Sequence, residues 1–518
     1  MPSLPAVFSF RLIVIVFTTL LSLTACTPPR SPDKIVISGP FEPVSYDPAS
    51  SGYIFSRMQV IETLVDVNDD GTLRPGLATG WQSNDDFSEW TFHLREGVTF
   101  HDGSTMNAEV VRKSLAVAFG KPVPFDASLV KDLTIPDAHT VVFTLSQHYR
   151  PFPSLMSNYT MAILSPASFG KFNRTTALIG TGPYKITDFQ PPHNISTVRF
   201  DDYWGRPGSI KEVEYITGHR SETRALMVKT GQADIVYNLD PAAVEMLKSD
   251  DSVSVFSELI PRTTLIKLNL DDPILADRSV RQALSLALDR TGIASGILRV
   301  PGIEANQLFG PGMGVWYMND LPPPSQSLKQ AKALLEQAGW ELANDGVRYR
   351  NGKSLEMNMI TYANRPELII IATAIQDQWA QAGVKLNVHM ENSSAIPSGH
   401  TDGTLQTALM ARNFANIPDP LGILLADFTS EQGGEWGPMN WQNPALFSLI
   451  EQIGRETSEA SLPAQARDVI RTINDDLPLI PVVYYMQHSA VSDRLQHFSF
   501  DPYERSFRIA DLQIRSEP

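Results

Sequence analysis

Cysteine and positive charge are both scarce in this sequence of 518 residues. Its single cysteine, Cys26, has no partner within the chain for an internal disulfide bond, so hydrophobic cores must hold the fold together. Acidic residues outnumber basic ones by 57 to 42, and the net charge of −15 repels nucleic acids and anionic membrane surfaces. With 42% hydrophobic and 19% charged residues the composition is typical of globular proteins, and the length predicts about two to four domains.

The sequence has only one long hydrophobic run, and it lies near the N-terminus. Residues 12–23 follow Arg11 and precede Thr24, Ala25 and Cys26, which is the pattern of an export signal. The run is shorter than the roughly 20 apolar residues that span a bilayer. At the end of this segment, residues 23–26 resemble a bacterial lipobox. This resemblance implies cleavage after residue 25 and a lipid on Cys26. An ordinary signal peptide with a chance cysteine is the alternative. The proline-rich residues 26–33 predict an extended tether.

Motifs for catalysis and for direct metal binding are missing as well. There is no Gly-x-Ser-x-Gly elbow, and the glycine-rich residues 180–184 lack the Lys-Ser/Thr ending of a phosphate loop. No two of the ten histidines lie three to five residues apart, so no metal site is indicated by spacing. These absences argue against an enzyme, although a glycosidase with two carboxylates stays open as an alternative.

Helix and strand patterns alternate from residue 34 onward, which predicts an α/β fold with mixed sheets. Strands are expected at residues 35–37, 90–94, 97–100, 140–145, 233–237, 265–270, 384–388 and 479–485. Helices are expected at residues 221–230, 280–289, 327–338, 367–382 and 461–474.

Seven short motifs, in the same order along the chain, resemble those of one family. They are Pro-Gly-Leu-Ala at 75–78 with Trp81, Phe-His-Asp-Gly at 100–103, Gly-Thr-Gly-Pro-Tyr at 180–184, Tyr-Trp-Gly at 203–205, and the segments 224–234, 280–290 and 332–340. The family is that of the large bacterial solute-binding proteins of oligopeptide and nickel ABC importers, and this chain resembles its nickel branch more closely.

The resemblance implies a two-lobed periplasmic-binding-protein fold with an extra inserted domain and a hinge of two crossovers. Lobe I is expected at residues 34–52, 178–268 and 478–518, the inserted domain at 53–177 and lobe II at 269–477. The crossovers are expected near residues 265–270 and 479–485. The implied function is capture of a solute by closure of the two lobes of a monomer that works with a membrane permease. A sensor or adhesin built on the same fold is the alternative.

The resemblance also suggests which ligand is bound. Peptide-binding members clamp the ligand's amino group with an aspartate where this chain has Asn416, and an amide cannot neutralise an ammonium group. In nickel-binding members an arginine holds the carboxylates of a chelator, and Arg412 and Phe414 occupy the arginine and aromatic positions. Leu421 stands where a direct histidine ligand would be. A peptide-like solute and a chelated transition metal both stay open, with no direct metal ligand and no cofactor besides the lipid.

Four further aromatic residues are expected to line the cleft. Trp436 and Trp441 belong to a glycine-rich loop, and Tyr46 and Tyr53 would contribute from lobe I. The alternative for the two tryptophans is packing between elements of the lobe, and the alternative for Arg412 is an internal salt bridge.

Overall fold

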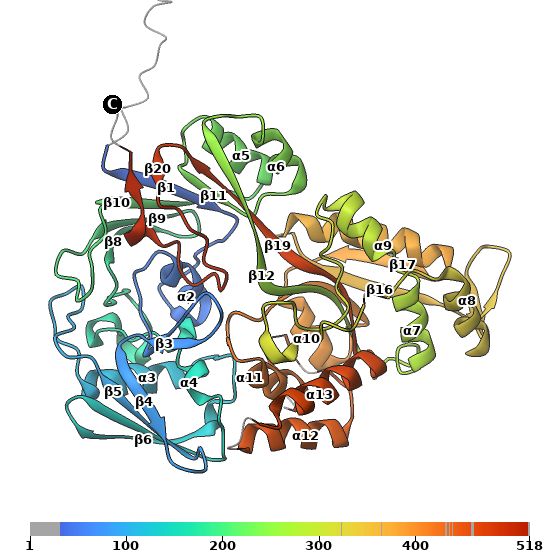
Figure 1. The fold of residues 1–518 in the computed structure, drawn as a ribbon, viewed down its shortest axis with the longest axis horizontal. Helices are drawn as coiled ribbons and strands as arrows, with labels where there is room; N and C mark the ends of the chain where they lie inside the picture. The colour runs from blue at the N-terminus through green and yellow to red at the C-terminus, as the bar shows by residue number, and fades with distance from the viewer. Residues whose placement is uncertain are drawn as a thin grey trace, which may run out of the picture.

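The computed structural model describes residues 32–322, 324–363, 365–429, 433–434, 436–437, 439–456 and 460–515. The chain forms two lobes that lie side by side and are joined by two long strands, which confirms the predicted two-lobed α/β fold (Figure 1). Cys26 and the predicted export signal lie outside these residues. In the part of the chain described, no helix is long and apolar enough to cross a membrane.

A ten-stranded mixed sheet continues through both lobes (Figure 1). Its strand order is β17-β16-β18-β12-β19-β11-β1-β10-β9-β8. The two central strands, β12 (Val253–Leu268) and β19 (Leu479–Ser492), pair antiparallel along most of their length. They are the two crossovers, because one end of each pairs within lobe I and the other end within lobe II.

The junction between the lobes is an irregularity in the pairing of β12 with β19. Leu259 pairs with Met486 and Thr263 with Tyr484, so three residues on β12 face a single residue, Tyr485, on β19. Such a bulge bends a strand, and the middle one of the three residues is Pro261, which has no N–H for the ladder. From residue 262 onward β12 pairs with β18 of lobe II. The chain therefore changes lobe at residues 260–262, slightly before the predicted stretch.

Lobe I is built around β1 (Lys34–Gly39), which alternates between two cores. Ile35 and Ile37 face one core and Val36 faces the other, as expected for a central strand covered on both sides. The other elements are α2 (Pro48–Arg57), β8 (Tyr184–Gln190), β9 (Asn194–Arg199), β10 (Glu212–Thr217), α5 (Ser221–Lys229), β11 (Ile235–Tyr237), α6 (Pro241–Leu247) and the pair β20 (Leu495–Gln496) and β21 (Gln513–Ile514). Asp47 begins α2 and accepts a hydrogen bond from the Ala49 N–H.

A separate antiparallel sheet follows α2 in the chain and lies below lobe I in Figure 1. Its order is β4 (Ala78–Ser83), β5 (Glu89–Leu94), β7 (Thr140–Leu145) and β6 (Val130–Asp137), with α3 (Ala108–Phe119), α4 (Phe152–Leu155) and the small pair β2 (Val65–Val67) and β3 (Leu73–Pro75) beside it. The strand predicted at residues 97–100 is wrong. Residues 98–100 are instead one arm of a tight hairpin that turns at residues 101–103, in which the Phe100 N–H donates to the Ser104 carbonyl and only Thr99 and Thr105 form a bridge.

Lobe II completes the large sheet with β16 (Glu356–Thr361), β17 (Lys385–Met390) and β18 (Thr407–Asn413). Its helices are α7 (Arg278–Leu286), α8 (Leu328–Gln337), α9 (Pro366–Gln381), α10 (Ala395–Asp402), α11 (Pro420–Leu424), α12 (Pro444–Arg455) and α13 (Leu462–Asp476), and a small sheet consists of β13 (Glu341–Leu342), β14 (Arg348–Arg350) and β15 (Lys353–Ser354). The predicted helices agree with these within a few residues at each end. Trp379 of α9 anchors the lobe, since its buried indole N–H donates to the Leu284 carbonyl over 3.1 Å.

The inserted region and lobe II touch each other directly. The Arg150 N–H donates to the Gly454 carbonyl over 3.1 Å, and Asn158 Nδ2 donates to the Asn416 carbonyl over 2.8 Å. Since these bonds join segments far apart in the chain across the space between the lobes, the structure represents a closed arrangement.

Candidate functional site: the interlobe cavity

A cavity lies between the lobes, and both of them line it. Its wall consists of Tyr53, Ser56 and Arg57 of α2, Tyr159 of the inserted region, Asn413 at the end of β18, Ala415 and Asn416 just after it, and Tyr503, Glu504 and Arg505 near the C-terminus. We call this space the interlobe cavity. Two residues predicted separately from the sequence, Tyr53 and Asn416, meet here. A solute in this position would contact both lobes at once.

Asn416 is held in place by neutral groups. Its carbonyl accepts the bond from Asn158, and its side-chain oxygen lies 3.4 Å from Asn413 Nδ2. The one carboxylate in the cavity wall is that of Glu504, and it already faces two arginines. The described wall therefore offers amides, hydroxyls and guanidinium groups, and no unshared carboxylate for a ligand's ammonium group.

Three arginines gather beside this wall from three different elements. Arg57 ends α2, Arg262 lies at the bulge of β12, and Arg365 directly precedes α9. We call them the arginine cluster. All three are buried, and their guanidinium carbons lie over aromatic rings: Arg57 is 4.5 Å from the centre of the Phe41 ring, and Arg262 is 5.1 Å from that of Tyr485. Cation–π contacts of this kind partly compensate for the loss of water around the charge.

Arg365 links the cluster to both lobes. Its guanidinium carbon lies 5.5 Å from the Phe41 ring centre in lobe I and 5.3 Å from that of Tyr485 in the crossover strand β19. Its Nη1 also donates to the Tyr485 hydroxyl over 3.3 Å. The cluster therefore sits at the junction where the two lobes meet.

Two carboxylates lie next to the arginine cluster. Glu504 Oε1 is 3.4 Å from Arg57 Nη2, and its Oε2 is 2.6 Å from Arg262 Nη2. Burial disfavours the charged form of Glu504, but the attraction of the three arginines outweighs it and lowers the pKa of this carboxyl. Burial raises the pKa of Glu367, so this second carboxyl neutralises the cluster less well.

Arg262 is the member of the cluster with unused donors. Its side chain is 3% exposed, and its Nε and Nη1 have no hydrogen-bond partner among the described residues. Burial, and next the neighbouring Arg365, lower the pKa of Arg262. A buried donor without a partner lowers the stability of the folded state by roughly 1–3 kcal/mol, and a charged donor lowers it by more.

Arg412 and Trp436 lie in a second cavity inside lobe II, on the other face of β12 and β18. Arg412 binds Asp427 through two bonds of 3.0 Å, from Nε and from Nη2. This pair is the internal salt bridge given above as the alternative role of Arg412. Lys267 lies in the same cavity, donates to the Trp436 and Gly437 carbonyls, and has its pKa lowered by burial to about 7.

The remaining predicted aromatics pack within their lobes. Phe414 is fully buried against Phe309, with ring centres 4.9 Å apart. Trp441 packs edge to face on Phe428 and Phe447. In lobe I, the Tyr46 ring lies 4.7 Å from that of Phe189. Leu421 is buried as well. The structure thus groups Tyr53 with Asn416, and Arg412 with Trp436, while Phe414, Trp441 and Tyr46 line neither of these two cavities.

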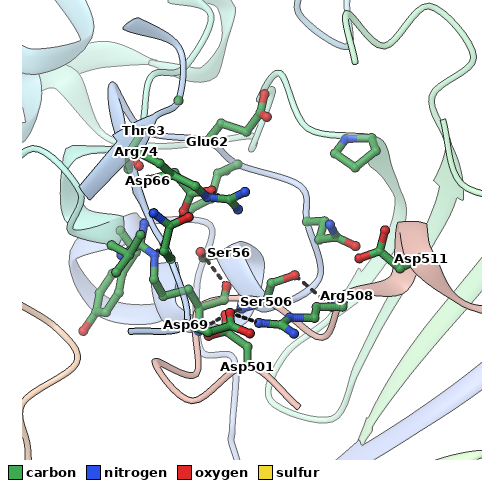
Figure 2. Close-up of a pocket in the computed structure, with 18 of the residues that line it drawn as sticks. Ser56, Glu62, Thr63, Asp66, Asp69, Arg74, Asp501, Ser506, Arg508 and Asp511 are labelled. Carbon is green, nitrogen blue, oxygen red and sulfur yellow. Dashed lines mark hydrogen bonds and ion pairs between the residues drawn. The ribbon is translucent and has the colours of Figure 1, made fainter. Parts of the chain in front are cut away.

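A larger polar cavity adjoins the interlobe cavity and shares Ser56, Tyr159 and Arg505 with it. Figure 2 shows charged side chains around this space, among them Glu62, Asp66, Asp69, Arg74, Asp501, Arg508 and Asp511. Most of these charges are already paired: Arg74 with Asp66 at 2.5 Å, Arg505 with Asp66 at 3.3 Å, and Arg508 with Asp69. The pairs fix the C-terminal segment against the inserted region.

Comparison with known proteins decides the family. The signature of the bacterial extracellular solute-binding proteins, family 5 (middle region), matches residues 72–435. The chain belongs to this family. The nickel-binding periplasmic protein of Escherichia coli (strain K12) is 26% identical to it, over 93% of this chain and 96% of that protein. The prediction of a solute-binding protein rather than an enzyme is thereby confirmed.

Two solved structures show the same fold in family members with different bound molecules. NikA from Brucella suis, in complex with Fe(III)-EDTA, superposes with a TM-score of 0.83 at 20% identity, covering 93% of this chain and 100% of that one. The oligopeptide-binding protein AppA from Bacillus subtilis, in complex with a nonapeptide, superposes with a TM-score of 0.81 at 20% identity, covering 93% and 99%.

Two residues of the cavity wall, Arg57 and Glu504, are not predicted from the sequence, and neither is Arg262 beside them. The one local signal is Arg262 itself, since an arginine beside a proline at the start of an apolar strand is unusual. No group of three His, Cys, Asp or Glu side chains suitable for a metal occurs in the described ranges.

Proposed function

We propose that this protein is the substrate-binding component of an ABC importer, exported and anchored to a membrane by a lipid on Cys26. The observation that carries this proposal is the interlobe cavity, which both lobes line and which the Arg150–Gly454 and Asn158–Asn416 bonds close. A solute that contacts both lobes binds the closed form more tightly and so shifts the population towards it. The membrane permease then recognises the closed form.

Two classes of solute fit the chemistry of the cavity. One is a peptide-like molecule, as the nonapeptide complex of AppA illustrates, and the other is a transition metal carried by a chelator, as a nickel-binding relative suggests. Asn416 disfavours a free ammonium group at the clamp position. The lack of a metal-ligand group in the described ranges favours a metal that arrives already chelated. Of the residues predicted from sequence, we assign direct contact to Tyr53 and Asn416. Arg412, Phe414, Trp436, Trp441 and Tyr46 would shape the lobes around them.

The first test is to purify the chain, with Cys26→Ser in place of the lipid site, from cells grown in rich medium. Native mass spectrometry with elemental analysis would identify a retained solute, and small-angle scattering would follow lobe closure. We expect a stoichiometric small molecule and a smaller radius of gyration with it than without it. A protein that retains and binds no solute, and never changes its radius, would refute the proposal. Loss of metabolic lipid labelling in the Cys26→Ala chain tests the anchor.

A further inference from the structure

We propose that a further cavity, on the opposite side of the crossover strands from the interlobe cavity, binds a small neutral alcohol with an aliphatic body, and that this molecule holds the lobes closed. We call this space the hinge cavity. The inference goes beyond the proposed function, because it gives the chain a ligand other than the solute that it captures.

Both lobes and both crossover strands line the hinge cavity. Its wall combines Pro241 at the start of α6 in lobe I, Thr264 and Tyr485 on the crossover strands, and Ile303 and Glu367 in lobe II. Most of the residues in the wall are apolar. The cavity has a volume of about 30 Å³, which is the share of one water molecule in the liquid. With its open mouth included, the empty space is about 400 Å³.

The hinge cavity lies at the outer edge of β19, between two attachments of that strand. On the side of lobe I, the Leu239 N–H donates to the His488 carbonyl over 3.2 Å. On the side of lobe II, the Tyr484 N–H donates to the Ile303 carbonyl over 2.7 Å. All four of these residues line the cavity, which therefore spans the place where β19 passes from one lobe to the other.

The interlobe cavity lies at the other edge of the same pair of strands. At the outer edge of β12, Arg262 pairs with Asn413, and Asn413 lines the interlobe cavity. Figure 1 agrees, since α6 and α9 lie on the upper right side of the crossover strands and α2 and α11 on the lower left side. The hinge thus separates the two cavities.

Cavities on opposite sides of a hinge change size in opposite directions. A rotation that opens the interlobe cavity presses the start of α6 towards Ile303 and Glu367, so the hinge cavity keeps its space only while the lobes are closed. A molecule that fills it binds the closed form more tightly than the open form and shifts the population towards closure. By linkage, this molecule and the captured solute each raise the affinity of the protein for the other.

Two neighbouring threonines of β12 indicate the polar chemistry of the ligand. Thr263 and Thr264 are both buried, with 0% and 1% of their surface exposed. The Thr263 hydroxyl donates to the Leu308 carbonyl over 2.7 Å. The Thr264 hydroxyl has no hydrogen-bond partner among the residues that the structure describes, and neither has Glu367 Oε1. Both of these residues line the hinge cavity, so a polar group bound there would supply the missing bonds.

The charges around the cavity favour a neutral ligand. Arg262 and Arg365 both lie over the ring of Tyr485, at 5.1 and 5.3 Å, and their positive charges repel an ammonium group. The carboxyl groups of Asp240 and Glu367 in the wall repel an anion. A hydroxyl group can donate to Glu367 and accept from Thr264 at the same time. Its aliphatic body would lie against the apolar residues of the mouth.

The test uses three probes of similar shape that differ in their polar end. Isopentyl alcohol is neutral and donates a hydrogen bond, its isomer isobutyl methyl ether cannot donate, and isopentylamine is a cation. Isothermal titration on the full chain with Cys26→Ser would compare them. We expect the alcohol to bind with a Kd of about 0.1–1 mM, as a ligand of this size allows. It should bind about five- to tenfold more tightly than the ether or the amine.

Coupling to lobe closure is measured on the same protein. Small-angle scattering of the solute-free chain should show a smaller radius of gyration with saturating alcohol than with the ether. Native mass spectrometry should show that the purified chain loses its retained solute about fivefold more slowly in the presence of the alcohol.

Variants assign the preference to the hinge cavity. In Thr264→Val the alcohol should lose its advantage over the ether, and the Tm of the ligand-free protein should stay equal or rise, because a buried oxygen without a partner is removed. Thr263→Val is the matched control, since it breaks the bond to Leu308, lowers the Tm and should leave the preference intact. Val300→Trp, at a half-buried position in the wall, should fill the cavity and abolish binding of the alcohol.

Lack of alcohol binding at about 10 mM, where a Kd below 1 mM would saturate the site, would overturn the inference. Binding that Val300→Trp leaves intact would overturn the location. Equal binding of alcohol and ether, or an undiminished preference in Thr264→Val, would overturn the assigned chemistry. Binding that changes neither the radius of gyration nor the release of solute would overturn the coupling to closure. In each case a retained solute would leave the proposed function standing.

Discussion

Arg262 on β12 and Glu504 near the C-terminus approach to 2.6 Å, and this contact ties a crossover strand to lobe I at the point where the lobes meet. Glu504 also accepts from Arg57 through its backbone carbonyl, at 2.7 Å from Nε. One glutamate thus holds two arginines whose charges would otherwise repel each other inside the protein.

Replacing Glu504 with glutamine should destabilise the protein strongly. The substitution leaves the buried arginine cluster without its main counter-charge, and breaking a buried ion pair by removing one partner costs about 3–5 kcal/mol. Urea unfolding at neutral pH would measure the loss. The control is Glu109→Gln, which removes an exposed pair with Arg112 on α3 and should change the free energy of unfolding by less than about 1 kcal/mol. Similar small effects for both variants would contradict the assigned role of Glu504.

Glu62 should make the stability of the protein depend on pH. Burial raises its pKa from 4.5 to about 7, although Trp204, Thr181 and Tyr203 donate to its oxygens over 2.7–2.9 Å. Because the folded pKa is the higher one, the folded state keeps a proton that the unfolded state releases. The stabilising contribution is complete below pH 4.5 and is lost as the pH rises through about 7.

The measurement is the free energy of unfolding at several pH values between 4.5 and about 7. Relative to Glu62→Gln, which does not titrate, the unmodified protein should lose on the order of 3 kcal/mol across this range. Glu96→Gln, a substitution at an exposed position, serves as the control. Its free energy of unfolding should depend on pH as that of the unmodified protein does. A pH slope that Glu62→Gln leaves unchanged would show that another group is responsible.

Arg412 and Asp427 should behave as a structural pair rather than as a solute contact. In a double-mutant cycle of Arg412→Met and Asp427→Asn we expect a coupling free energy of about 1–3 kcal/mol in stability. Solute retention by Arg412→Met, followed by native mass spectrometry, should equal that of the unmodified protein. Loss of retention in Arg412→Met would instead place a solute contact in lobe II.

Asn158→Asp should weaken solute binding by opening the lobes. The aspartate can still accept the bonds that Asn158 Oδ1 receives from the backbone N–H and hydroxyl of Thr160, but it cannot donate to the Asn416 carbonyl. Losing one hydrogen bond of the closed form should raise the Kd about five- to tenfold. Small-angle scattering should then show a larger radius of gyration at a fixed solute concentration.

The same exchange at Asn107 serves as the control. Asn107 also accepts a backbone hydrogen bond at the start of a helix, α3, but it has no bond to lobe II. Asn107→Asp should therefore bind solute normally. An unchanged Kd in Asn158→Asp would indicate that this bond does not contribute to closure.

The sequence predicts the elements whose pattern is local, and fails where contacts are distant. In strand β5 the buried residues Trp90, Phe92 and Leu94 alternate with more exposed ones. This two-residue period of hydrophobic side chains can be recognised in the sequence. The strand expected at residues 97–100 is only a short hairpin arm with a single bridge, because the chain turns at residues 101–103 and the Phe100 N–H donates to the nearby Ser104 carbonyl. The cavity could be predicted only from the resemblance to the family, which places Asn416 in the cleft. Arg57, Arg262 and Glu504 come from three distant segments, and no spacing reveals that they meet.

The order of strands in the large sheet constrains how this chain can fold. Strand β19, among the last segments to be synthesised, lies between β11 of lobe I and β12, which continues into lobe II. Neither lobe can complete its half of the sheet until residues 479–492 have joined it. The N-terminal portion is thereby kept from reaching its final structure early. Under the export proposed above, this late completion of the sheet would keep the chain unfolded until it has crossed the membrane.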